Sequence, residues 1–144
     1  MSKKTNEQIE QFIWDALAPL LSKEQGAGTI SGDLYPEDCR PLDSKLEDAV
    51  IAVSNGFPGQ VQSGRARLNI YVPDIDCGYG RKVKDKGRLE ELSRLDTVIV
   101  DMLNASDTDY LWGLFATTAT IAAADIEQHF VNINLEFDCV TFND

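Results

Sequence analysis

The sequence predicts an α+β fold: a single two-layer domain with a mainly antiparallel sheet and two helices on one face. Three observations lead to it. A chain of 144 residues suits one hydrophobic core. Two segments repeat apolar residues at helical spacing, and two others alternate apolar and polar residues as half-buried strands do. The expected order of elements is α-β-β-β-α-β-β, and no linker or repeat divides residues 1–144.

The first expected element is an amphipathic helix. Apolar residues recur at three- and four-residue steps from Ile9 to Leu21. Residues 5–8, Thr-Asn-Glu-Gln, fit a capping box at the start of this helix, and Gly26 and Gly28 follow its end.

Three strands are expected next. Residues 29–35 favour β structure and stop at Pro36. Ser44 with Glu47 fits a helix cap, but the short apolar run at residues 49–54 stops at a turn signal, which favours a buried strand. The third strand, residues 62–72, follows through a hairpin connection at residues 55–64.

The third strand has two different faces. Its apolar positions point toward the expected core. Its other face carries Arg65, Arg67, Asn69 and Tyr71. Of these, Arg65, Arg67 and Tyr71 are a candidate protein-binding patch.

The second half begins with a segment without apolar period, residues 73–87, which predicts a loop. From Arg88 the helical spacing returns and predicts a second helix that ends near Asn104. Two β-like runs follow, residues 110–120 and 129–142, and the last alternates most clearly. Between them, residues 119–127 are either a turn of helix or an irregular connection.

Three cysteines at positions 39, 77 and 139 form an odd, widely spaced set with no CxxC pair. This spacing predicts neither a disulfide framework nor a zinc cluster, and it favours reduced thiols in a cytoplasmic protein. Cys139 lies on the apolar side of the last strand, which predicts a small buried side chain.

Membrane insertion and secretion are not expected. The longest apolar stretch, residues 111–124, contains three threonines and is shorter than the ~20 residues that span a bilayer. The N-terminal segment carries Glu7, Glu10 and Asp15 where a signal peptide would be apolar.

Negative charge is concentrated in the last third of the chain. The net charge is −11, and residues 89–144 hold one basic residue, Arg94, against 11 acidic ones. Duplex affinity comes mainly from cations that neutralise phosphates. We therefore expect no specific nucleic-acid binding.

No catalytic, cofactor-binding or metal-binding residues are predicted. His129 is the only histidine and no GxSxG motif accompanies it, which favours a structural histidine. Residues 74–78, Asp-Ile-Asp-Cys-Gly, resemble the start of a calcium loop, but Tyr79 and Asp85 replace its required glycine and glutamate. Residues 78–82 lack the serine or threonine of a phosphate loop.

One basic cluster stands out in this acidic chain. Residues 81–88 hold five cations and one acid, Asp85. Its members are Arg81, Lys82, Lys84, Lys86 and Arg88. A solvated loop is the simplest interpretation, and contact with an acidic partner or a phosphate backbone is the alternative.

The strings RPLDSKLEDAVIAV (residues 40–53), GRARLNIYVPDI (64–75) and QHFVNINLEF (128–137), with the leucine-rich helix between them, resemble small prophage proteins of the head-tail joining and tail completion group, which includes tail terminators and minor capsid proteins. The resemblance implies a non-enzymatic subunit that forms a ring, often hexameric, around a channel that passes DNA. Its partners would be copies of itself or other phage neck and tail proteins. It would be a virion component if the prophage is active.

Within such a ring, the basic residues 81–88 would meet the acidic last third of the next subunit. Two other functions remain open. A small enzyme or ligand-binding domain would use a pocket between sheet and helices, with Asp74, Asp76 and Cys77 at its polar edge. An acidic adaptor or inhibitor would bind a basic target.

Overall fold

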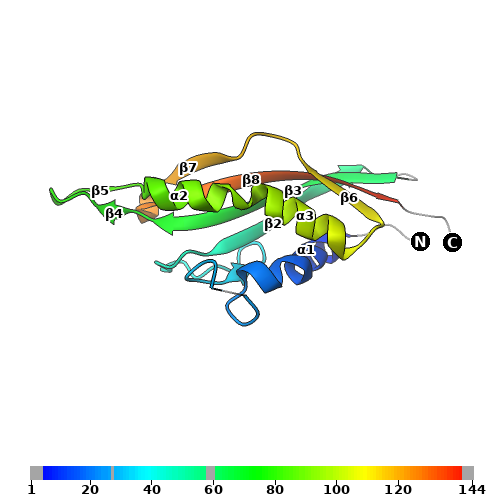
Figure 1. Cartoon of the computed structure of the whole chain (residues 1–144), viewed down its shortest axis with the longest axis horizontal. Helices are drawn as coiled ribbons and strands as arrows, with labels where there is room; N and C mark the ends of the chain where they lie inside the picture. The colour runs from blue at the N-terminus through cyan, green and yellow to red at the C-terminus, as the bar shows by residue number, and fades with distance from the viewer. Residues whose placement is uncertain (1–4, 27, 58–60, 141–144) are drawn as a thin grey trace.

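The computed structural model describes residues 5–26, 28–57 and 61–140. One large sheet carries all three α-helices on the same face, and a small two-stranded ribbon extends from one end (Figure 1). The elements are α1 (Asn6–Leu21), β1 (Leu34–Tyr35), β2 (Ala49–Phe57), β3 (Val61–Pro73), β4 (Ile75–Asp76), β5 (Lys82–Val83), α2 (Lys86–Ser93), α3 (Leu95–Ser106), β6 (Tyr110–Leu114), β7 (Ala119–Ala123), a 3₁₀ turn (Ala124–Ile126) and β8 (Gln128–Val140).

The large sheet has the order β1-β2-β3-β8-β6, and β7 also pairs with β8. Only β1 is parallel to its neighbour, β2. Strand β8 is long enough to pair with β3 on one side and with two strands on the other: β6 opposite residues 135–139 and β7 opposite residues 128–132. This arrangement confirms the α+β prediction with a mainly antiparallel sheet.

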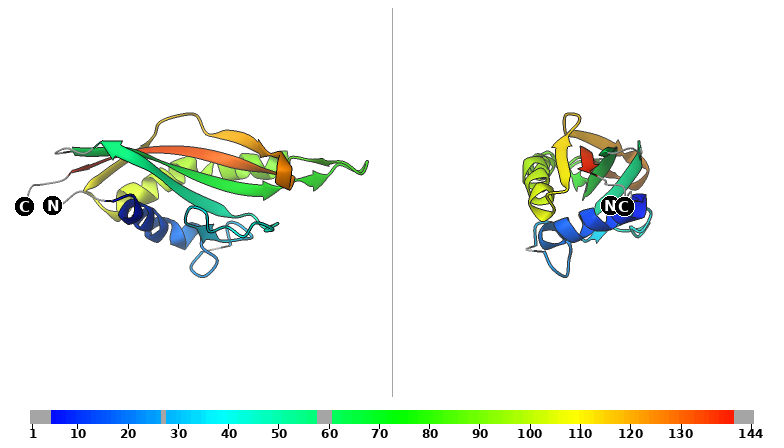
Figure 2. Two further views of the ribbon diagram at one scale, coloured as in Figure 1. Left: turned by 180° about the vertical axis from the view of Figure 1, so that it is seen from behind. Right: turned by 90° about the vertical axis from the view of Figure 1, so that its right-hand side faces the viewer.

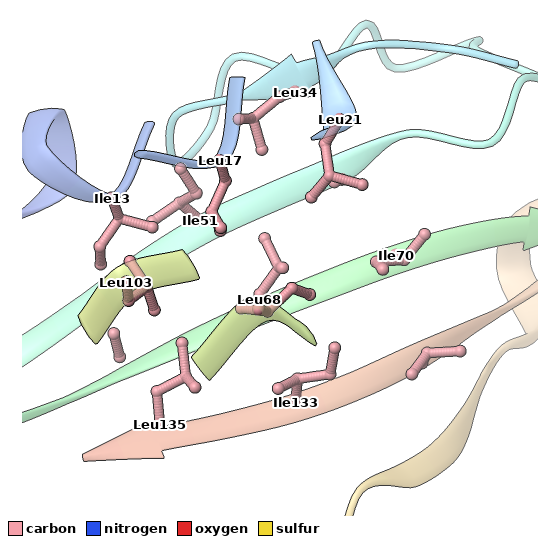
Figure 3. Packing of buried hydrophobic residues seen from close by; sticks show 14 of the residues in the cluster. Ile13, Leu17, Leu21, Leu34, Ile51, Leu68, Ile70, Leu103, Ile133 and Leu135 are labelled. Carbon is pink, nitrogen blue, oxygen red and sulfur yellow. The ribbon is translucent and has the colours of Figure 1, made fainter. Parts of the chain in front are cut away.

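The core lies between the sheet and the helices. Leu68 in β3 pairs in register with Ile51 of β2 and Ile133 of β8, and all three side chains are fully buried. Ile13 and Leu17 of α1 cover this row from above (Figure 3). Burying each such side chain contributes roughly 1.5–3 kcal/mol, so this row anchors the two layers.

Helix α1 begins with the predicted capping box. The Thr5 hydroxyl accepts from the Gln8 backbone N–H at 3.1 Å, and the Gln8 side chain accepts from the Thr5 N–H at 2.8 Å. These bonds satisfy two donors at the helix start. The apolar stripe of α1 then faces β2.

The second predicted helix is in fact two helices that meet at Arg94. Its backbone, with φ −73° and ψ −8°, ends α2 and begins α3. The apolar spacing continues across this break, so periodicity alone did not reveal it. The break lets α2 pack on β8 while α3 reaches β6 and α1.

The first predicted strand is much shorter than expected. Only Leu34 and Tyr35 pair with β2, and residues 29–32 bend instead. The cause lies in Asp48, whose carboxylate accepts from the Asp33 N–H at 3.0 Å. Gly32 packs so closely on Asp48 that a Cβ at this position would collide with the carboxylate. The turn predicted between β2 and β3 falls in part on residues 58–60, outside the described residues.

The predicted run 110–120 is interrupted, because β6 ends at Leu114 and β7 begins at Ala119. The undecided residues 119–127 hold β7 and then the 3₁₀ turn, closed by Glu127 in the left-handed conformation at φ 54°. The final strand is confirmed through Val140, and residues 141–142 lie outside the described part.

The prediction that residues 73–87 form an irregular loop is wrong in part. This segment contains β4 and β5, which form a ribbon that continues past the end of β3, away from the sheet (Figure 2, left). These strands were not predicted because each has only two paired residues, too few to show a period of two. The glycines of the turn between them also indicated a loop.

Candidate functional site

Residues 74–85, here called the arm, form a hairpin. Ile75 pairs with Val83 and Asp76 with Lys82. The Cys77 N–H donates to the Arg81 carbonyl at 3.0 Å, which closes the turn. Two glycines make this turn possible, since Gly78 (φ 93°) and Gly80 (φ 69°) both adopt the left-handed conformation that other residues disfavour.

The arm exposes apolar side chains. Tyr79 at the tip is 92% exposed, and Ile75 and Val83 are 46% and 37% exposed. A two-stranded hairpin without further packing is marginally stable in water. A ribbon that projects into solvent in this way is typically stabilised by packing against the surface of another chain.

Four of the five residues of the predicted basic cluster are exposed to solvent on or beside the arm. Arg81, Lys82, Lys84 and Lys86 are exposed, and none forms an ion pair with the described residues. The acids of the arm have local partners: Asp76 accepts from the Gly78 N–H at 2.8 Å, and Asp85 caps α2. The arm therefore presents free positive charge beside its apolar tip.

Arg88, the fifth cation, has an internal role. It forms two bonds to Glu47, from Nε to Oε2 at 2.6 Å and from Nη2 to Oε1 at 2.8 Å. It also donates to the Thr29 carbonyl at 2.5 Å. The Glu47 hydrogen bond is the main cause that raises the pKa of Arg88. This half-buried clamp ties α2 to the segment before β2.

The root of the arm is held by His129. Its Nδ1 lies 2.7 Å from Asp74 Oδ1, and both side chains are largely buried. The Asp74 N–H also donates to the Glu127 carbonyl at 3.1 Å. The only histidine thus joins the arm to the start of β8.

The predicted patch lies on the outer face of β3, the face away from the helices. Arg65 stacks on Phe115 at 3.9 Å from its ring centroid. Tyr71 lies at 5.0 Å from the ring of Phe130 and beneath the guanidinium of Arg40 at 4.2 Å.

Arg67 shares this face and is exposed between these two stacks. The three patch residues therefore share one face, but only Arg67 lacks a stacking partner among the described residues. The arm cations are not part of this patch, because they lie beyond Pro73, where β3 ends.

Sequence reasoning missed a buried ion pair. Asp48 is fully buried, and its Oδ2 accepts from Arg40 Nε at 2.8 Å. Arg40 Nη2 also donates to Gln128 Oε1 at 2.8 Å and to the Leu46 carbonyl at 3.1 Å. The pair fastens the segment before β2 to the first residue of β8. An acid directly before a buried apolar run was the available signal.

A groove of about 800 Å³ lies on the outer face at the end of the sheet opposite the arm. Side chains of β2, β3, β6 and β8 line it. They include Ser54, Ser63, Arg65, Leu111, Glu136 and Asp138. Leu111 is 67% exposed, and both acids are exposed. Ten residue steps of extended chain separate Gly64, beside the groove, from Asp74 at the arm root, a distance of about 33 Å.

The structure does not gather the residues named for a ligand pocket. Asp74 pairs with His129, Asp76 supports the turn, and Cys77 lies within that turn. None of them lines the groove. Among the described residues no cluster of three or more His, Cys, Asp or Glu side chains is placed to hold a metal ion.

None of the helices in the described ranges combines the length and apolar content needed to cross a membrane. No disulfide joins the three cysteines in the described part of the chain, and Cys139 is buried as predicted. A scan against protein-family models finds no match, and a search of the curated proteins finds no similar sequence. Geometry and chemistry therefore carry the functional argument.

Proposed function

We propose that this chain is a non-enzymatic assembly subunit that acts through protein-protein contacts, as a neck or tail completion protein of a prophage. The observation that carries this proposal is the arm. It extends beyond the sheet and ends in an almost fully exposed tyrosine, beside four cations without ion-pair partners among the described residues. A surface of this kind gains stability by docking on another chain.

Charge supports the same proposal. The arm cations sit on a protein whose residues 89–144 are strongly acidic. A head-to-tail interface requires two different, complementary patches on each subunit. An acidic ring lining would also repel DNA, which suits passage of DNA through a channel. The resemblance to head-tail joining and tail completion proteins supports the proposal that this kind of interface lies at the neck or tail end.

Inactivating the gene in a lysogen and inducing the prophage tests the proposal. We expect heads and tails that fail to join, or tails of abnormal length, in electron micrographs. Normal infectious particles from the inactivated strain would contradict the proposal.

Complementation then tests the arm itself. Wild-type protein is expected to restore joined particles, and a variant carrying Lys82→Glu and Lys84→Glu is not. The matched control carries Lys23→Glu and Lys45→Glu, which changes the net charge equally at exposed positions on the body. It is expected to restore particles as wild type does.

A further inference from the structure

We infer that the arm of one copy docks in the outer-face groove of a second copy of this chain. The inference rests on the proposed assembly function and names its interface. Its partner is identical to the chain itself, and the contact is heterologous because it joins two different surfaces.

The first argument is position. The arm extends from one end of β3 (Figure 1), whereas the groove lies near the other end, beside Ser63 and Gly64, so one molecule cannot fill its own groove. A second copy placed end to end brings its arm to the groove. Repetition of one such contact gives a closed ring if the rotation closes, and a filament if it does not.

The second argument is charge. Glu136 and Asp138 are exposed on the groove, and neither forms an ion pair with the described residues. Lys82 and Lys84 are likewise free on the arm. Among the described residues that line the groove, Arg65 is the one cation. It lies opposite Glu136 in the sheet and is stacked on Phe115, while Asp138 accepts a hydrogen bond from the Ser63 hydroxyl at 2.6 Å. Acids in the groove and lysines on the arm are therefore complementary.

The third argument is apolar matching. Leu111 in the groove is an exposed leucine on an outward strand position, and Tyr79 is the exposed tip of the arm. Aromatic anchors surrounded by polar residues are typical of the centre of an interface. Docking Tyr79 against Leu111 covers both.

Cysteine cross-linking between two variants tests this contact. One carries Tyr79→Cys and the other Leu111→Cys, both in a background with Cys39→Ser and Cys77→Ser. Cys139 is fully buried and stays. Docked residues share an effective concentration near the millimolar range, so at ~10 µM protein we expect roughly a hundredfold faster disulfide formation than by chance collision.

The matched control replaces Leu111→Cys with Leu42→Cys, at a 97% exposed site outside the groove. It is expected to cross-link with Tyr79→Cys only at the collision rate. Equal rates for positions 42 and 111 would overturn the inference, as would a chain that stays monomeric and uncross-linked at every concentration tested.

Charge exchange separates this inference from the proposed function. Reversal of the arm (Lys82→Glu with Lys84→Glu) or of the groove (Glu136→Lys with Asp138→Lys) is expected to weaken self-association about tenfold or more. Mixing the two reversed chains is expected to restore association, because the arm of each chain then meets a groove of opposite charge on the other chain. If arm reversal still abolishes particle assembly but groove reversal has no effect, the arm binds elsewhere: the proposed function stands and the inference fails.

Discussion

Arg88 and Glu47 form a two-bond ion pair that fastens helix α2 to the segment before β2. The sequence placed Arg88 with four neighbouring cations, and the structure separates it from them. Its contribution is to the stability of the monomer, whereas the arm cations remain open to a partner. This difference leads to the first prediction.

Substitution Arg88→Ala is expected to lower the free energy of unfolding by about 2–3 kcal/mol. It leaves the Glu47 carboxylate and the Thr29 carbonyl without their partner in a half-buried site. Urea unfolding measures the change. The control is Arg94→Ala, which removes an exposed pair with Glu90 and is expected to cost less than about 0.5 kcal/mol. Equal losses would show that the clamp is not stabilising.

A second prediction concerns the central core row. Substitution Leu68→Ala removes a fully buried side chain between Ile51 and Ile133, and we expect a loss of about 2–5 kcal/mol. Leu111→Ala, in the exposed groove, is the control and is expected to change stability by less than about 0.5 kcal/mol. Similar denaturation midpoints for both variants would contradict the described sheet register.

Stability is also expected to fall in alkaline solution because of Tyr110. Burial raises its pKa above the ordinary value of 10.0, and Cys139 raises it further. Because the folded state holds this proton more tightly, the stabilisation is full below pH 10. It is lost as the pH rises beyond that value and the unfolded chain ionises.

Urea unfolding between pH 9 and pH 11 measures this loss. Tyr110→Phe is expected to make the free energy of unfolding fall less steeply with rising pH in this range, by up to ~1.4 kcal/mol per pH unit. An unchanged slope in the variant would refute the assignment to Tyr110. Tyr35, whose pKa is also raised by burial, then accounts for part of the remaining slope.

A fourth prediction concerns the sheet edge at β7. This strand pairs only with β8 in the described sheet, and its five residues carry no charge. Such edges are open to pairing with other chains. Thr120→Lys is expected to reduce aggregation on heating, as followed by light scattering, while Thr97→Lys on α3 is not. Equal scattering from both variants would exclude the edge as the aggregation site.

Alternation predicted the sheet well because β3 and β8 each have one buried face, and burial imposes a period of two. The helix break at Arg94 was not predictable from the same reasoning, since the apolar spacing runs through it. Arm strands of two residues are too short to leave a period at all.

The candidate interaction residues were predictable only as a charge cluster. Sequence proximity grouped Arg88 with Lys86, although Arg88 is half-buried against Glu47 and Lys86 is exposed. The Arg40–Asp48 ion pair was not predicted, because tertiary packing brings its partners together. Gln128, which also binds Arg40, lies on a strand far away in the sequence.

Hydrogen exchange of the arm tests the central claim most directly. In dilute monomer, the amides of residues 75–83 are expected to exchange within seconds, because the ribbon has little packing of its own. At concentrations where the chain assembles, we expect their exchange to slow by about tenfold or more, while β8 stays protected throughout. Equally rapid exchange of the arm in the monomer and in the assembly would contradict its role as the docking element.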